Sequence, residues 1–137
     1  MASSDPVLAF EVPASAEYLA LRVAAGLSAM SEEGAATGLP ASWCSVCVRV
    51  GGELVGMGRV VGDGGLFLFV VDIAVAPAWQ GRGLGRRIME ALMARIHEGA
   101  QPRTMVGLIA DGTAFRLYEK FGFKRVAPAA HGMLLRL

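Results

Sequence analysis

The chain has 137 residues, of which 54% are hydrophobic and 18% charged, and this composition predicts one globular domain, residues 1–137, with a substantial core. A net charge of +1 argues against a nucleic-acid partner, which normally requires a basic face. No apolar run approaches the roughly 18 residues of a membrane span, and no basic segment precedes an apolar one at the N-terminus. We therefore expect no membrane partner and a cytoplasmic location.

Two helices are predicted in the first third of the chain. Residues 15–25 carry apolar side chains at helical spacing, with Ser15 as the expected cap and Gly26 as the expected stop. A shorter helix is expected to begin after Ser31, with two acidic residues in its first turn, and to end near residues 38–40.

Three strands are predicted next, joined by short glycine-containing turns. The strand-like runs cover residues 42–50, 54–61 and 66–75, and Gly51-Gly52 joins the first two. Tight turns of this kind connect neighbouring antiparallel strands, so the three runs predict an antiparallel meander.

The remaining residues alternate between helical and strand-like segments. The sequence predicts helices over residues 83–98 and 113–121, a buried strand over 104–110, and one or two final strands ending at residue 137. Gly122 is the expected C-cap of the second of these helices. The whole pattern predicts an α/β domain of the α+β type, built around one mixed sheet.

The two cysteines form a C-x-x-C pattern, Cys44 to Cys47, inside a predicted strand. A redox pair normally has its first thiolate at a helix N-terminus, and residues three apart on a strand point to opposite faces. We therefore interpret both as structural thiols, and we expect no metal site because no second Cys or His pair is present.

The segment Gln80–Gly85 reads QGRGLG and lies between the long strand and a helix. The first amides of a helix have no internal partner, and glycines let a phosphate approach the backbone closely. Arg82, Arg86 and Arg87 add positive charge. The segment fits neither a Walker A loop, which needs Lys before Ser or Thr, nor the dinucleotide fingerprint G-x-G-x-x-G, and a glycine turn without a ligand is the alternative.

Gln80–Gly85 resembles the Q/R-x-x-G-x-G/A motif of the GNAT superfamily of acyl-CoA-dependent N-acyltransferases. A second stretch, DGTAFRLYEKFGF at residues 111–123, is similar to the superfamily signature N-x-x-A-x-x-L-Y-E-K-x-G-F. The resemblance extends over essentially the full chain. It implies a largely antiparallel mixed sheet flanked by helices, split between the fourth and fifth strands.

The resemblance also implies acetyl-CoA as cosubstrate and no metal. The diphosphate would bind loop amides from about Arg82 to Arg86, and the pantetheine arm would lie in the split, beside the strand 66–75. A backbone amide near Val75 would stabilise the oxyanion. The implied cofactor-binding residues are Ile73, Ala74, Val75, Gln80, Gly81, Arg82, Gly83, Leu84, Gly85, Arg86, Asp111 and Tyr118.

Tyr118 is the side chain that the resemblance assigns to the departing thiolate, which its hydroxyl would protonate or hydrogen-bond. A ring that merely packs in the core is the alternative. Asp111 departs from the signature, where asparagine is common. An ionised aspartate only accepts hydrogen bonds, so it could bind a pantetheine amide, or it could cap the following helix.

Asp72 is the only charged residue in the run from Leu66 to Val75. A buried carboxylate there could act as general base, directly or through water, or it could hydrogen-bond neighbouring backbone or Arg59 across the hairpin. In the resemblance the acceptor lies near the first two helices and the central hairpin. The candidate acceptor-binding residues are Leu27, Met30, Glu33 and Arg59.

Taken together, these features predict an N-acetyltransferase that moves an acetyl group from acetyl-CoA to a primary amine. We expect this acceptor to be a small molecule whose amine attacks directly in a ternary complex. Acetylation of a protein N-terminus or lysine is a second hypothesis, and a non-catalytic acyl-CoA-binding sensor or partner subunit is a third. Dimerisation is common in the superfamily, so a homodimer is compatible with the sequence.

Overall fold

A computed structural model describes residues 5–137 as a five-stranded sheet covered by helices on both faces. The strands run in the order β1-β2-β3-β4-β5, antiparallel except for the parallel pair β4–β5. Their bounds are β1 Val7–Phe10, β2 Cys44–Val50, β3 Glu53–Gly62, β4 Phe67–Val75 and β5 Met105–Leu108. The β2–β3 turn has positive φ at both Gly51 (56°) and Gly52 (84°), a conformation that favours glycine in two-residue hairpins.

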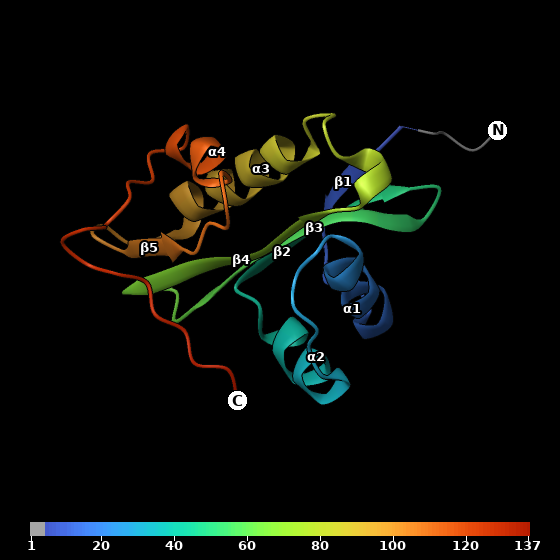
Figure 1. The fold of residues 1–137 in the computed structure, drawn as a ribbon, viewed down its shortest axis with the longest axis horizontal. Helices are drawn as coiled ribbons and strands as arrows, with labels where there is room; N and C mark the ends of the chain where they lie inside the picture. Colours follow the sequence, from blue (N-terminus) through green and yellow to red (C-terminus); the bar gives the residue numbers. More distant parts are fainter. Residues whose placement is uncertain (1–4) are drawn as a thin grey trace.

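The helices form two layers, one on each face of the sheet (Figure 1). Helices α1 (Ser15–Ala24) and α2 (Glu32–Gly38) cover one face, followed by the short η1 (Leu39–Ala41). Helices α3 (Leu84–Gly99) and α4 (Phe115–Glu119) cover the other, and η2 (Pro77–Trp79) precedes α3. No helix within residues 5–137 is long and apolar enough to cross a membrane.

Each face of the sheet has its own apolar core. On the α3 side, Ile88, Met89 and Leu92 are fully buried against Val46 and Val60. On the α1 side, Tyr18 and Leu21 pack with side chains from β2, β3 and β4. Alternation along the strands therefore divides the buried side chains between two cores.

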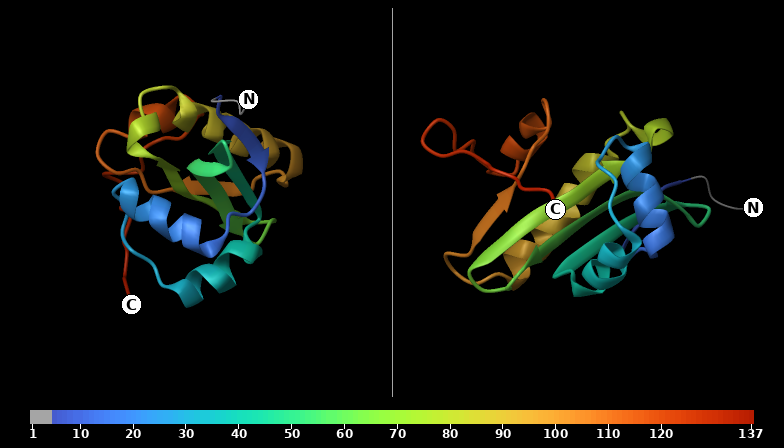
Figure 2. Two further views of the ribbon diagram at one scale, coloured as in Figure 1. Left: turned by 90° about the vertical axis from the view of Figure 1, so that its right-hand side faces the viewer. Right: turned by 60° about the horizontal axis from the view of Figure 1, so that its bottom comes forward.

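The sheet is split at the C-terminal end of β4. β5 pairs only with residues 67–70, whereas β4 continues to Val75. Figure 2 shows β5 diverging from β4 beyond this point. The opening between them is the split that the sequence predicted between the fourth and fifth strands.

Most predicted elements are confirmed, and three features differ. The N-terminal strand β1 was not predicted, because a four-residue strand with mostly exposed side chains carries little periodic signal. The N-cap of α1 is Ala14, not Ser15, and the Ala14 amide donates to Glu17 Oε2 at 2.8 Å. The predicted final strands are wrong: the structure has no strand from residue 109 to 137.

The error at the C-terminus has a physical reason. Met133, Leu134 and Leu135 are strand-like by composition, but all three are more than 80% exposed. A strand requires a neighbour that accepts and donates its ladder hydrogen bonds. In this structure the segment instead runs past β5 and ends on the α1–α2 side of the sheet (Figure 1).

Candidate active site at the sheet split

The glycine segment forms the turn that leads into α3. Gly81 has φ 75° and Gly83, the N-cap of α3, has φ 80°, a region that other residues rarely adopt. The first intrahelical bond runs from the Arg87 amide to the Gly83 carbonyl at 3.1 Å. The preceding amides of α3 therefore have no acceptor within the helix and are available to an anion.

Gly85 differs from the two glycines before it, because its backbone has ordinary helical geometry. A Cβ added there would have Leu117 Cδ2 as its nearest neighbour, at 3.8 Å, which is an ordinary contact. Packing within the protein thus does not require glycine at this position. The same contact shows that α4, which carries Leu117, lies beside the start of α3.

The arginines of the segment have partners of their own. Arg82 stacks on the Trp79 ring with its guanidinium carbon 4.5 Å from the centroid, and Arg86 donates to Glu90 at 3.1 Å one helical turn later. Both remain exposed. Their charge lies at the rim of the junction, while the backbone amides form its centre.

Val75 directs its backbone groups into the split. The Ala76 amide donates to the Val55 carbonyl at 2.8 Å, so the opposed residues Gly56 and Val75 form a non-hydrogen-bonded pair. The N–H and C=O of Val75 therefore face away from β3, toward the edge that β5 has left. The Gln80 side chain donates to that carbonyl at 3.0 Å.

Alternation along β4 separates the neighbours of Val75. Ile73 directs its amide group toward the open edge as Val75 does, whereas Ala74 directs its own toward Met57 on β3. The Ala74 side chain is buried in the α1-side core. Of the three β4 residues predicted to contact the cofactor, Ile73 and Val75 thus have backbone groups free to do so.

Tyr118 is a buried residue of α4 whose ring meets Phe123 edge to face at 6.5 Å. Its hydroxyl has no hydrogen-bond partner among the described residues. Because every fully buried side-chain oxygen in residues 5–137 does have a partner, the Tyr118 hydroxyl must be accessible to solvent. Burial, and secondly the charge of Asp111, raise the pKa of Tyr118. The phenol therefore keeps its proton to a higher pH than a free tyrosine does.

Asp111 lies in the turn between β5 and α4. The alternative role as a helix cap is not seen, because the N-cap of α4 is Ala114 and no side chain caps that helix. The Asp111 carbonyl instead accepts from the Ala114 amide at 3.0 Å. Its carboxylate acts on Tyr118 through charge.

Asp72 lies in a β-bulge where Asp72 and Ile73 together oppose Gly58 of β3. Its φ of 60° is unusual for a residue other than glycine. Its side chain is only 4% exposed and accepts hydrogen bonds from Arg22, Arg59 and, at 3.0 Å, the Tyr18 hydroxyl. The contact with Arg59 is the one that the structural alternative anticipated.

The acceptor-binding candidates lie on the α1–α2 side of the sheet, and only two of the four are enclosed. Leu27 packs against the α1-side core, and Arg59 is 17% exposed. Met30 is 48% exposed, and Glu33 lies in the exposed first turn of α2. Leu27 and Arg59 are therefore the two candidates that adjoin the buried Asp72 region.

Sequence reasoning missed Tyr18, Arg22, Ser28 and Arg136. Arg22 donates to the Ser28 carbonyl at 2.9 Å and to its hydroxyl at 3.0 Å. The sequence did carry a signal for Arg22, because its spacing places this arginine on the same helical face as Tyr18 and Leu21. The structure shows that all three side chains on this face are buried. For Arg136 no sequence signal existed, because the contact depends on the course of the C-terminal segment.

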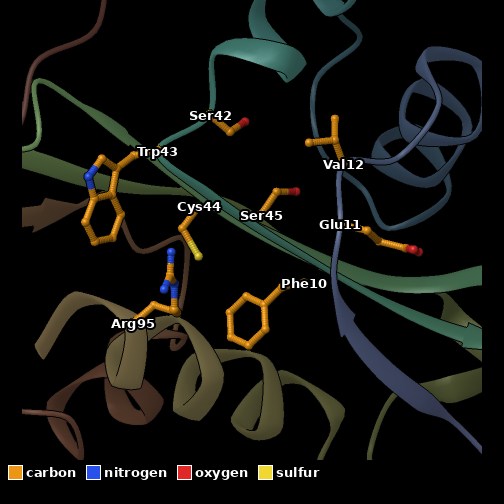
Figure 3. Close-up of a pocket in the computed structure, with 8 residues that line it drawn as sticks. All are labelled: Phe10, Glu11, Val12, Ser42, Trp43, Cys44, Ser45 and Arg95. Carbon is orange, nitrogen blue, oxygen red and sulfur yellow. The ribbon is translucent and has the colours of Figure 1, made fainter. Parts of the chain in front are cut away.

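The structure has two cavities that no residue of β4 lines. One, of about 770 Å³, lies between β5, α4 and residues 122–132, and Tyr118 lines it. The other, of about 380 Å³, is shown in Figure 3. There Arg95 of α3 extends between Phe10 and Trp43 toward Cys44.

Both cysteines are buried and free, as the sequence predicted. Cys44 belongs to the α3-side core and Cys47 to the α1-side core, so they point to opposite faces. Burial raises the pKa of Cys44, and burial raises that of Cys47 to about 12. Among residues 5–137 no three His, Cys, Asp or Glu side chains gather where they could hold a metal ion.

Comparison with known proteins identifies the family. Residues 42–125 match the family model of an acetyltransferase (GNAT) domain, and the chain belongs to the GNAT family. A probable acetyltransferase from meticillin-resistant Staphylococcus aureus, described as a protein of unknown function, has a solved structure that superposes with a TM-score of 0.93. It is 39% identical, and the match covers 97% of this chain and 100% of that one.

Curated relatives match over a shorter length. The chain is 34% identical to serotonin N-acetyltransferase 2, chloroplastic, of Oryza sativa subsp. japonica over 82 residues, which is 60% of this chain and 40% of the relative. The ribosomal-protein-S18-alanine N-acetyltransferase of Escherichia coli shares the fold, with a TM-score of 0.72 and 19% identity over 88% of this chain and 78% of that one. The chain thus spans less than half the length of the first of these relatives.

Proposed function

We propose that the protein is an N-acetyltransferase that moves an acetyl group from acetyl-CoA to a primary amine of a small molecule. The observation that carries this proposal is the open edge of β4, where the Val75 amide faces the split directly before the free amides of the glycine turn. An extended pantetheine arm can pair with such an edge as an added strand would, while the turn binds the diphosphate. Membership of the GNAT family supports acetyl-CoA as the donor.

The chemistry follows from these positions. The amine nitrogen attacks the thioester carbonyl, and the carbonyl oxygen gains charge that the Val75 amide stabilises. When the C–S bond breaks, the thiolate receives a proton from Tyr118, whose raised pKa keeps that proton in place until it is needed. The acceptor must lose its ammonium proton to solvent before it attacks, and its nitrogen loses a second proton to solvent after attack. Solvent then returns one proton to the Tyr118 phenolate, so the cycle closes without a covalent acyl-enzyme.

We assign Asp72 a positioning role in this reaction. Its two oxygens already accept from two guanidiniums and the Tyr18 hydroxyl, and its side chain is only 4% exposed. These contacts, which come from α1 and β3, hold the bulge that precedes the Val75 backbone at the split.

A small acceptor is supported by the name of the rice relative, a serotonin N-acetyltransferase, since serotonin is a small amine. The likeness to the ribosomal-protein acetyltransferase concerns the fold alone. The test is release of the CoA thiol from acetyl-CoA across a panel of small amines and of peptides. Transfer to peptides but not to small amines would support the protein-acetylating alternative, and CoA binding without any transfer would support the sensor.

A further inference from the structure

We infer that the acceptor is a small primary amine that also carries an anionic group, a carboxylate or a phosphate ester. This inference rests on the proposed function and specifies its substrate class. It is carried by four charged side chains on the α1–α2 side of the split, which we call the arginine cluster: Arg22, Arg59, Arg136 and Asp72.

Three members of the arginine cluster, Arg22, Arg59 and Asp72, place an excess of positive charge where little solvent reaches. Arg22 and Arg59 share a single carboxylate, and the side chains of the three residues are 8%, 17% and 4% exposed, in the order Arg22, Arg59, Asp72. Among the described residues neither arginine has a second acidic partner. Charge that is buried without a counterion is costly, so this region favours an anion.

A third guanidinium approaches from the C-terminal segment. Arg136 donates to Ser28 Oγ at 3.1 Å and to the Ala29 carbonyl, both neutral acceptors. Because Arg22 donates to the same Ser28 hydroxyl at 3.0 Å, two like charges meet at one oxygen. An anion bound there would relieve their repulsion.

Arg59 retains a hydrogen-bonding edge for such an anion. Its Nε donates to Asp72 and its Nη1 to Ser42 Oγ at 3.2 Å. The Nη2 group makes no hydrogen bond to any described residue. A guanidinium edge of this kind binds carboxylate and phosphate oxygens strongly, because the hydrogen bonds are charge-assisted.

The position of the cluster fits the acceptor and not the donor. Asp72 lies in the β4 bulge, immediately before the edge that would hold the thioester, but its side chain points to the α1 face. The glycine turn and α4 lie on the opposite face (Figure 1). An amine bound through an anionic tail at the cluster would therefore approach the thioester from the side opposite to CoA.

Matched amines test this inference. β-Alanine and phosphoethanolamine carry an anion, whereas propylamine and ethanolamine are their uncharged-tail counterparts, and putrescine carries a second cation. We expect kcat/KM for the anionic amines to exceed that of their counterparts by at least about tenfold, with putrescine the poorest. Equal or better transfer to propylamine, ethanolamine or putrescine would overturn the inference while leaving the acetyltransferase activity intact.

A binding measurement makes the test independent of turnover. Calorimetry on the protein saturated with CoA should show tighter binding of β-alanine or phosphoethanolamine than of the uncharged-tail amines. Comparison of those two anionic amines distinguishes a carboxylate from a phosphate ester. If CoA binds but the anionic amines show no preference in binding, the inference is wrong; if CoA itself does not bind, the proposed function fails first.

Substitution locates the effect. Arg136→Gln removes one exposed guanidinium without disturbing the buried pair with Asp72, and should reduce the preference for anionic amines several-fold while CoA affinity is unchanged. Arg95→Gln, on the opposite face of the sheet (Figure 3), is the matched control and should leave the preference unchanged. An undiminished preference in Arg136→Gln would remove the C-terminal segment from the acceptor site.

Discussion

Tyr18 donates its hydroxyl to Asp72 Oδ2 across 3.0 Å, linking α1 to a bulge in β4 that lies 54 positions further along the chain. The tyrosine is 3% exposed and the carboxylate side chain 4%. Asp72 also has a positive φ, which costs a residue other than glycine about 1 to 2 kcal/mol. Its contacts with α1 therefore hold in place the strained bulge that shapes the split.

Tyr18→Phe tests this link. Loss of a buried hydrogen bond to a charged group should lower the free energy of unfolding by about 1.5 to 3 kcal/mol, measured by urea denaturation at pH 7. Tyr118→Phe is the matched control, because its hydroxyl has no partner among the described residues, and its stability should change by less than about 0.5 kcal/mol. Equal effects of the two substitutions would contradict the role of the Tyr18–Asp72 bond.

The pH dependence of stability gives a second readout of Tyr18. Burial, and then the Asp72 charge, raise the pKa of Tyr18 above its ordinary value of 10.0. Below pH 10 both the folded and the unfolded chain keep the proton, so this group adds no pH dependence. As the pH rises from there toward the folded-state pKa, the unfolded chain ionises first and stability is lost. The loss above pH 10 should be smaller in Tyr18→Phe than in the parent chain.

These contacts also mark the limit of what the sequence could predict. Periodicity was sufficient for α1, α3 and the β2–β3 hairpin, because each buries a regular apolar face. The glycine segment was informative because backbone chemistry, and not a distant partner, determines it. The contact of Asp72 with Arg59 was anticipated because the two residues face each other across the β3–β4 hairpin. Its contacts with Tyr18 and Arg22 of α1 were not, because no local pattern specifies which distant side chains will meet. The final segment was wrongly predicted as strand for a related reason. Its composition favours a strand, but composition does not show whether a neighbouring strand is available to pair with it.

Gly85→Ala separates ligand binding from folding. The new methyl group would have its nearest protein neighbour at 3.8 Å, and alanine is the better helix former, so stability should be retained or increased. If CoA phosphates bind the α3 amides, the methyl group obstructs them, and the dissociation constant for CoA measured by calorimetry should rise by about tenfold or more. Gly38→Ala in α2, where a Cβ would meet nothing within 4 Å, is the control. Unchanged CoA affinity in Gly85→Ala would refute this site for the diphosphate.

The two thiols are expected to be inert in the folded protein. Cys47 is fully buried with its pKa raised to about 12, so roughly one molecule in ten thousand carries the thiolate at pH 8. A thiol-disulfide reagent at pH 8 should therefore label neither cysteine of the native protein within minutes, and both after denaturation. Fast labelling of native protein would show that the strand opens readily, and would reopen a reactive role for the C-x-x-C pair.

Tyr118 and Asp111 make a coupled prediction about the alkaline limb of activity. Tyr118→Phe should lower kcat by about 10²- to 10⁴-fold, the usual range for loss of a general acid, with the dissociation constant of CoA unchanged. Asp111→Asn removes the second cause of the raised Tyr118 pKa but leaves burial, the larger one, in place. The alkaline limb of kcat should then move to lower pH without disappearing, because the phenol loses its proton sooner. A limb that stays in place in Asp111→Asn, or full turnover in Tyr118→Phe, would exclude Tyr118 as the acid and leave its ring as a packing element of α4.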